Sequence, residues 1–294
     1  MKKIIFLMAL FYSVSFGQGW NSTVTTTISE SSLEKMDLFT NKNGNHLLIK
    51  RSSGNIVYYN FNSLGTVDNN KTVTLESNGD FPTIAGTNDH VYAFYKTGSY
   101  IKFKYSTNGG SSWIYNSNLD RYIGTNECNG IDAIYETNRG IHIVWGTRDS
   151  GSDFETYYIL LNTTTTPFQW DNYKNVTDYT QYEVGGAPSV TFSEGGVHIS
   201  YNLKVGVQVS GIMKTRDKVN GSWRVPQFIS TIDESMAERL EVRGGSLYAV
   251  YAKLYVSPLY VYYHLAYKSR TLSSPRRRPT NVLTFRIANR APST

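Results

Sequence analysis

The sequence predicts an all-β protein, a β-propeller of four-stranded antiparallel blades. Two observations predict this fold. The composition is rich in Tyr (23 of 294 residues) and poor in charge (18%), which is typical of a sheet protein. The chain also repeats itself with a period of about fifty residues, the length of one four-stranded blade. No segment has a convincing helical pattern with caps.

Each of five repeats has the same order of elements. A short apolar first strand is expected at 36–40, 82–85, 131–135, 188–192 and 239–242. A tight turn rich in Gly and Asn follows, and then a second strand at 45–49, 89–93, 141–145, 197–201 and 246–250. The third strand alternates apolar and polar residues, as at 100–105. The fourth strand often opens with Trp, as at Trp113, Trp170 and Trp223.

The two ends differ from the body at 18–275. Residues 1–17 read as a signal peptide, because Lys2 and Lys3 precede an apolar run, and they predict secretion. Segment 20–28 resembles a fourth strand, and we expect it to close the last blade. The basic tail 276–294 contains no acid and is expected to be disordered or aberrant, with binding to a negative surface as the alternative. A truncated six-bladed propeller also stays open, since the fifth repeat lacks its Trp.

The charge of the body argues against nucleic acid as a partner. Removing two Lys from the signal peptide and five Arg from the tail leaves 29 − 2 − 5 = 22 basic residues against 23 acidic ones. No apolar run after residue 16 is long enough to span a bilayer, so no transmembrane segment is expected in the mature chain. Cys128 is the only cysteine, which excludes an intrachain disulfide.

No cofactor or metal is expected. Four histidines occur at anchors of the repeats, at His46, His90, His142 and His198. Equivalent positions in different blades diverge around the axis and cannot meet at one ion. We therefore expect each His to bond the turn beside it.

One turn carries a resemblance to a known family. Residues 106–113 read Ser-Thr-Asn-Gly-Gly-Ser-Ser-Trp and resemble the Asp-box (BNR repeat) of the sialidase-like β-propeller superfamily, secreted bacterial type. Asn108 stands in place of the Asp, and residues 215–223 look like a longer copy. The resemblance implies structural turns on the rim. It also implies a ligand site where the first strands begin and the loops between second and third strands emerge.

Candidate site residues gather at that predicted face. Charged and aromatic groups suit recognition of sugar hydroxyls, carboxylates and ring faces. The candidate ligand-binding residues are Arg51, Lys96, Arg148, Lys204, Lys253, Asp37, Tyr95, Trp145, Tyr201 and Tyr251. The candidate catalytic carboxylates are Asp80, Asp132 and Glu234, since glycoside hydrolysis needs two carboxylates.

The leading hypothesis is non-covalent binding of an extracellular glycan or surface protein through this face. A glycoside hydrolase of the exo-sialidase kind is the first alternative. Against it, Arg51 and Arg148 supply only two of the three arginines that a sialidase uses, and Lys occupies the loop in three of the five repeats. A non-catalytic structural module of a larger surface system is the second alternative.

Overall fold

The structure is a computed structural model of the chain. It describes residues 32–124, 127–148, 154–177, 183–184, 188–193, 196–205, 208–217, 221–224, 227–228, 235–243, 245–256, 261–271 and 284–286. These residues form antiparallel β-sheets and two short 3-10 turns. The chain divides into two compact units, Met1–Arg121 and Tyr122–Thr294, and each is described by itself.

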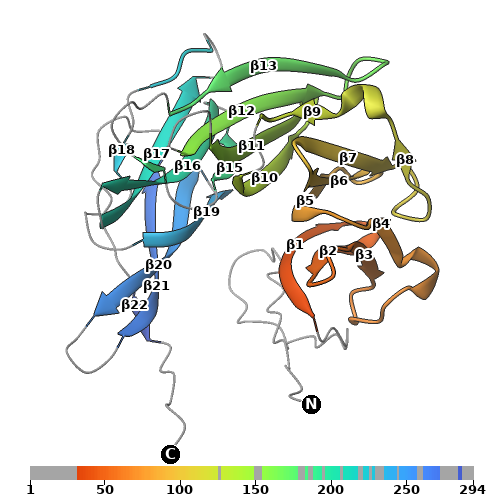
Figure 1. Ribbon diagram of the computed structural model, residues 1–294, viewed down its shortest axis with the longest axis horizontal. Coiled ribbons are helices and arrows are strands. Elements are labelled where there is room, and N and C mark those ends of the chain that lie inside the picture. The colour runs from red at the N-terminus through yellow and green to blue at the C-terminus, as the bar shows by residue number, and fades with distance from the viewer. Residues whose placement is uncertain are drawn as a thin grey trace, which may run out of the picture. The chain divides into compact units, whose positions relative to one another are not determined.

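Unit 1 contains two sheets, in each of which four consecutive strands pair in chain order (Figure 1). The first sheet consists of β1 (Leu33–Asn41), β2 (Gly44–Arg51), β3 (Ile56–Phe61) and β4 (Val73–Glu76), with the 3-10 turn η1 (Asn69–Lys71) before β4. The second consists of β5 (Asp80–Gly86), β6 (Val91–Thr97), β7 (Tyr100–Ser106) and β8 (Ile114–Tyr115). The turn η2 (Ser117–Leu119) follows, and the boundary between the units falls within the short β9 (Arg121–Tyr122), which pairs with β7.

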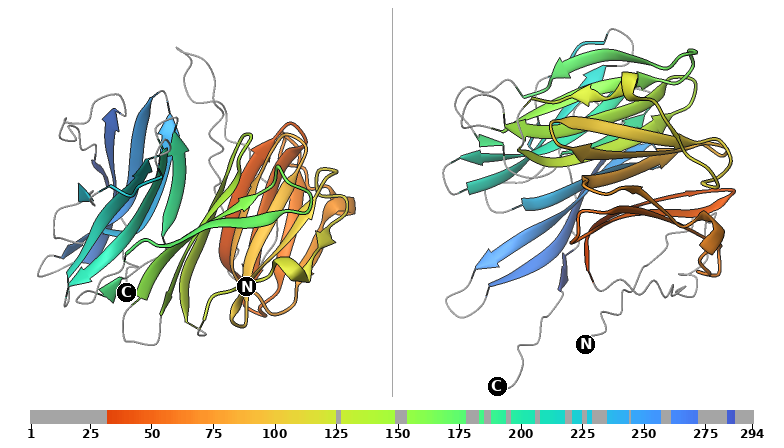
Figure 2. Two further views of the ribbon diagram at one scale, coloured as in Figure 1. Left: turned by 90° about the horizontal axis from the view of Figure 1, so that it is seen from above. Right: turned by 45° about the vertical axis from the view of Figure 1, so that its right-hand side comes forward.

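Unit 2 contains three further sheets (Figure 2). The third sheet is β10 (Cys128–Glu136), β11 (Gly140–Arg148), β12 (Phe154–Asn162) and β13 (Gln169–Asn175). The fourth is β14 (Glu183–Val184), β15 (Ser189–Ser193), β16 (Gly196–Val205), β17 (Gln208–Asp217) and β18 (Gln227–Phe228). The fifth is β19 (Ser235–Arg243), β20 (Ser246–Val256), β21 (Val261–Thr271) and β22 (Thr284–Arg286).

The predicted all-β class and antiparallel sheets are confirmed, and of the five sheets in the described residues three have four strands and two have a fifth. Every expected first and second strand overlaps an observed strand, because alternating and buried apolar runs dictate both positions. Thr284–Arg286 of the basic tail pairs with β21, so these three residues belong to the fifth sheet. The expected signal peptide 1–17 and the expected closing strand 20–28 lie outside the described residues. Among the residues described, no helix is long and apolar enough to cross a membrane.

Apolar side chains fill the space between neighbouring sheets of each unit. In unit 1, Leu48 and Tyr58 of the first sheet share a cluster with Ile84 and Ala93 of the second. In unit 2, Val144 and Tyr158 of the third sheet share another with Val190 and Ile199 of the fourth. The middle strands are buried on both faces, which explains why they read as nearly continuous apolar runs.

Candidate functional site

Each sheet has two ends with different backbone structure. We call the end where the first strand begins and the second strand finishes the loop end, and the opposite end the turn end. Near the loop end, the pairing of the first with the second strand is interrupted in four sheets. The interruptions lie between Leu33 and Lys35, Asp80 and Thr83, Cys128 and Gly130, and Met236 and Arg239. Because a bulge bends a strand and re-aims its side chains, the predicted face is where the backbone departs from regular geometry.

Asp80, a candidate catalytic residue, lies at the centre of a charged cluster in unit 1. Lys35 Nζ lies 2.6 Å from its Oδ1 and Lys50 Nζ lies 3.2 Å from its Oδ2. Lys50 Nζ is also 2.9 Å from Oε2 of Glu34. We call Glu34, Lys35, Lys50 and Asp80 the Asp80 cluster. The side chains of Lys35 and Asp80 are 37% and 32% exposed, so a ligand can reach the cluster.

The ions of the Asp80 cluster stabilise one another's charged forms. Burial alone would raise the pKa of the Asp80 carboxyl, but hydrogen bonds from Lys35 and the Phe81 backbone N–H outweigh it and lower the pKa. Burial would lower the pKa of Lys50, and its hydrogen bonds to Glu34 and Asp80 raise it instead. Asp80 is therefore a hydrogen-bond acceptor at neutral pH and cannot serve as a proton donor.

Phe81 follows Asp80 in an unusual backbone conformation. Its φ is 50°, a value that costs energy for a bulky residue. Its N–H donates to Asp80 Oδ1 at 2.7 Å, and Lys35 Nζ lies 3.3 Å from the centroid of its ring. The carboxylate and the cation therefore hold the strained residue beside the cluster.

Two predicted basic residues, Lys96 and Arg51, lie at the same end of unit 1. Lys96 is the register partner of Asp80 across β5 and β6, and no carboxylate among the described residues lies within ion-pair distance of it. Arg51 Nη2 donates to the Tyr59 hydroxyl at 2.9 Å. Asp80, Lys96 and Arg51 thus lie at one end of two neighbouring sheets.

Asp37 and Asp132, in contrast, are engaged in contacts between sheets, Asp132 buried at 4% exposure and Asp37 partly buried. Asp37 Oδ2 accepts from Thr83 Oγ1 at 2.8 Å and from the Ile84 N–H at 2.9 Å. Asp132 makes the same pair of contacts with Ser189 Oγ (2.8 Å) and the Val190 N–H (2.9 Å), and Arg239 donates to its other oxygen. The expectation that these two carboxylates face a ligand is corrected here: they join the first strands of neighbouring sheets.

The four predicted aromatic residues also belong to the core. Tyr95, Trp145, Tyr201 and Tyr251 are at most 5% exposed. Trp145 stacks on Tyr157, with ring centroids 5.6 Å apart. A buried ring has no open face for a sugar, so these residues support the sheets in place of flanking a ligand.

The remaining predicted residues are placed only in part. Arg148 lies at the loop end of the third sheet, with Nε 3.1 Å from Oε2 of Glu127 and its guanidinium 4.9 Å from the Phe154 ring centroid. Lys204 and Lys253 lie in β16 and β20, but their side chains are outside the described structure. Glu234 also lies outside the described residues.

The turn end carries hydrogen-bonded histidines, as expected. His46 Nε2 lies 2.8 Å from Asn41 Oδ1, and its Nδ1 lies 2.6 Å from the Tyr58 hydroxyl. His142 bonds Glu136 and Tyr158 in the same way, each at 2.9 Å, and His198 Nε2 lies 2.8 Å from Ser193 Oγ. Strand register corrects one repeat anchor, because Tyr92 occupies the equivalent position in the second sheet and His90 lies two residues earlier. Among the residues described, no group of three or more His, Cys, Asp or Glu side chains could hold a metal.

The turn at 106–113 is held by its own side chains. Asn108 Oδ1 accepts from the Ser112 N–H at 2.9 Å, and Ser106 Oγ accepts from the Gly110 N–H at 2.8 Å. Gly109 and Gly110 have φ values of 66° and 90°, which suit glycine. Trp113 then packs edge-on against Tyr58 of the first sheet, at 4.8 Å between centroids. The turn therefore connects two sheets and has the structural role predicted for it.

Sequence reasoning missed four members of the candidate site: Glu34, Lys35, Lys50 and Phe81. Lys50 directly precedes Arg51 at the end of a strand, and a charged residue there was a usable signal. Glu34 and Lys35 precede the apolar core of the first strand, so only the bulge shows where they point. The strain at Phe81 has no sequence signal beyond the Pro that follows it.

Comparison with known proteins shows similarity of structure without similarity of sequence. No family model and no curated protein matches the chain. The solved structure of polysaccharide lyase Uly1 is similar, with a TM-score of 0.57 and 8% identity over 93% of this chain and 76% of that one. The SapL1 lectin, solved with alpha methyl fucoside, has a TM-score of 0.53 and 8% identity, covering 85% and 79% of the two chains. An exo-beta-1,3-galactanase from Phanerochaete chrysosporium has a TM-score of 0.50 and 10% identity, covering 80% and 59%.

The shared feature is the fold. TM-scores of 0.50 to 0.57 at identities of 8–10% show similarity of fold and nothing finer. The function must therefore be argued from the residues of the loop end.

Proposed function

We propose that this protein is a secreted, closed β-propeller of the sialidase-like superfamily that binds an extracellular glycan at the loop end of its sheets. In unit 1 the Asp80 cluster is the centre of contact. The observation that carries the proposal is a half-exposed carboxylate bonded to two ammonium groups at a bulged, strained strand start. Strain and bulges of this kind concentrate at functional sites.

The chemistry of the cluster suits sugar hydroxyls. A hydroxyl both donates and accepts, so neighbouring hydroxyls can donate to Asp80 and accept from Lys35 or Lys50. Bonds to charged groups are stronger than bonds between neutral groups, which favours a polar ligand over water. The Phe81 ring beside Lys35 adds an apolar surface of the kind that packs on a sugar ring. The fold of the similar lectin and enzymes is consistent with this use.

The cluster favours binding over hydrolysis. Glycoside hydrolysis needs one carboxylic acid that donates a proton and one carboxylate. Asp80 has a lowered pKa, and Asp132 is occupied by contacts between sheets. The carboxylates proposed as a catalytic pair therefore do not provide the acid.

A glycan array run on the full chain, followed by calorimetry on the strongest glycan, tests the proposal. Lys50→Met should lower affinity tenfold or more, because it removes a charged donor from the cluster. Lys42→Met is the matched control, since Lys42 pairs with Asp89 at the turn end and should leave affinity unchanged. A fluorogenic glycosidase panel runs beside the array. Turnover would replace the proposal with the hydrolase alternative, and silence in both assays would favour the structural module.

A further inference from the structure

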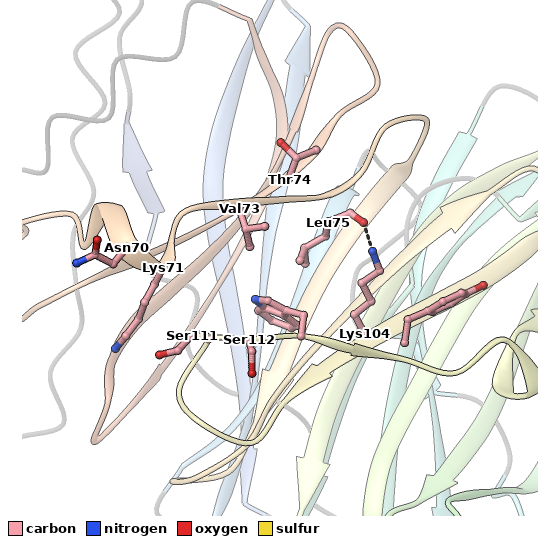
Figure 3. A pocket seen from close by; sticks show the side chains of 11 residues that line it. Asn70, Lys71, Val73, Thr74, Leu75, Lys104, Ser111 and Ser112 are labelled. Atoms are coloured by element: carbon pink, nitrogen blue, oxygen red, sulfur yellow. Dashed lines mark hydrogen bonds between the residues drawn. The ribbon is translucent and has the colours of Figure 1, made fainter.

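A second feature of unit 1 is a pocket of about 330 Å³, and none of the residues of the Asp80 cluster lines it (Figure 3). It lies between β4 of the first sheet and the turn at 106–113 of the second. Its described lining is Asn70, Lys71, Val73, Thr74, Leu75, Lys104, Gly110, Ser111, Ser112, Trp113 and Tyr115. The volume is in the range of small-molecule sites.

The charge of this pocket has one sign. Lys71 and Lys104 line it, and none of its described lining residues is Asp or Glu. Lys104 Nζ donates to the backbone carbonyl of Leu75, as the dashed line in Figure 3 marks, and an ammonium has two further hydrogens. Lys71 Nζ is 3.6 Å from Asp68, which is outside the lining. The pocket therefore offers cationic donors without a carboxylate of its own.

Neutral donors add to the two ammonium groups. The indole N–H of Trp113 is buried and has no hydrogen-bond partner in the described part of the chain. A buried donor without an acceptor is costly and is unusual in a folded protein. The edge-on contact with Tyr58 fixes the indole, so the ring cannot turn its N–H outward without losing that packing. Ser112 Oγ accepts from Asn108 Nδ2 at 2.9 Å and keeps its own hydrogen to donate.

The rest of the lining is apolar. Val73 of β4 and Tyr115 of β8 are 37% and 43% exposed, and Leu75 of β4 also lines the pocket. Lys102 and Lys104 hold their ammonium groups 5.9 and 5.8 Å from the centroid of the Tyr115 ring. An aromatic and aliphatic wall next to several donors suits a ligand with one apolar face and an acceptor-rich, negative group.

We infer that this pocket is a second binding site, which takes a single sugar residue carrying a negative charge. The sugar ring packs on the wall of Val73 and Tyr115, and its carboxylate or sulfate accepts from Lys104 and the Trp113 N–H. Uronic acids and sulfated sugars share this chemistry. The site is independent of the Asp80 cluster, so neither proposal requires the other.

Calorimetry with the full chain tests the inference with three sugars: D-glucuronic acid, D-glucose 6-sulfate and D-glucose. We expect at least one of the two anions to bind, more than tenfold tighter than glucose, and to weaken as NaCl is raised. The stronger of the two anions identifies the group that the site prefers. Equal binding of glucose, or no binding of either anion, would overturn the inference.

Three variants locate the binding. Lys104→Met should weaken anion binding tenfold or more, and Trp113→Phe, which keeps an aromatic ring, should weaken it several-fold. Lys42→Met is the control for general charge, because Lys42 lies in the same unit, pairs with Asp89 and is not among the lining residues. It should bind as the wild type does. Equal losses in Lys42→Met and Lys104→Met, at unchanged melting temperature, would show that general positive charge is responsible and would contradict the site. Asp80→Asn should leave this binding unchanged.

Discussion

The first sheet is joined to the second, and the third sheet to the fourth, through equivalent positions. In each pair, an aspartate of the first strand accepts from a hydroxyl and a backbone N–H of the next sheet. In each pair, a Trp of the second member packs edge-on against a Tyr of the first, at 4.8 Å for Trp113 on Tyr58 and 5.6 Å for Trp223 on Tyr158. Both tyrosines bond a histidine at the turn end. The buried pattern therefore repeats every two sheets.

The two pairs differ in charge at these positions. His46 bonds the neutral Asn41, whereas His142 bonds Glu136, which also pairs with Arg139 at 3.5 Å. Asp132 also accepts from the charged Arg239. The loop ends differ more, because the Asp80 cluster has no counterpart among the described residues of the third and fourth sheets. The contacts that repeat between pairs of sheets are therefore structural, and the candidate site is the cluster that does not repeat.

The largest loss of stability is expected from Gly110→Ala. A Cβ at Gly110 would meet the Tyr58 hydroxyl, and the φ of 90° is unfavourable for alanine. Overpacking and backbone strain together should cost about 3 kcal/mol or more in the free energy of unfolding, measured with urea. Gly98→Ala is the control, since its φ is 56° and no atom lies within 4 Å of the added Cβ. Equal losses would show that the contact between the turn and Tyr58 is unimportant.

The acid sensitivity of the first sheet should depend on His46. Burial, aided by Lys71, lowers the pKa of His46 to about 4 from the ordinary 6.5. The unfolded chain then binds the proton more tightly, so this stability is present above pH 6.5 and is lost as the pH falls toward 4. The shift corresponds to about 3 kcal/mol. Urea unfolding at pH 7, 5.5 and 4 should show this loss.

His46→Gln is the control for the pH series, because an amide can still bond both Asn41 and Tyr58. Its unfolding free energy should depend less on pH over the same range. A variant with the same pH dependence as the wild type would assign the acid sensitivity to other groups.

A smaller difference in unfolding free energy is expected between variants of Asp37 and Asp132. Asp37→Ala and Asp132→Ala each leave a hydroxyl and a backbone N–H without an acceptor, which should cost about 1–3 kcal/mol. Asp132→Ala should cost about 1 kcal/mol more, because Asp132 is 4% exposed whereas Asp37 is only partly buried, and an unsatisfied group costs more where it is buried. Arg239→Ala, which removes the charged donor to Asp132, measures the contribution of that bond. If Asp37→Ala proves the more harmful of the two, burial does not set the cost.

The smallest effect on stability is expected at the loop end. Lys35→Met breaks a partly exposed pair, which should change the free energy of unfolding by less than about 1 kcal/mol. Thermal unfolding measures this directly. A large loss would mean that the Asp80 cluster is itself part of the architecture.

More of the fold than of the candidate site could be predicted from the sequence. Periodic apolar runs and glycine turns located the strands, since both depend on local pattern. Asp37, Asp132, Tyr95 and Trp145 were assigned to a ligand face because strand order gives a residue's end of the sheet and says little about its burial. Packing between sheets decides burial, as the bonds from Thr83 to Asp37 and from Ser189 to Asp132 show. The bulge at Lys35 is set by tertiary contacts and has no sequence signature, and the strain at Phe81 has none beyond the Pro that follows it.

The central claim, that the Asp80 cluster binds a glycan, is tested most directly by a pair of matched aspartates. Asp80 and Asp89 lie in the same unit and both pair with lysine, Asp80 at the loop end and Asp89 at the turn end. Calorimetry should use the glycan that the wild type binds most tightly on the array. Asp80→Asn should lower affinity tenfold or more, while Asp89→Asn binds as the wild type does and both keep the wild-type melting temperature. Wild-type affinity in Asp80→Asn, or equal losses in both variants, would contradict the account.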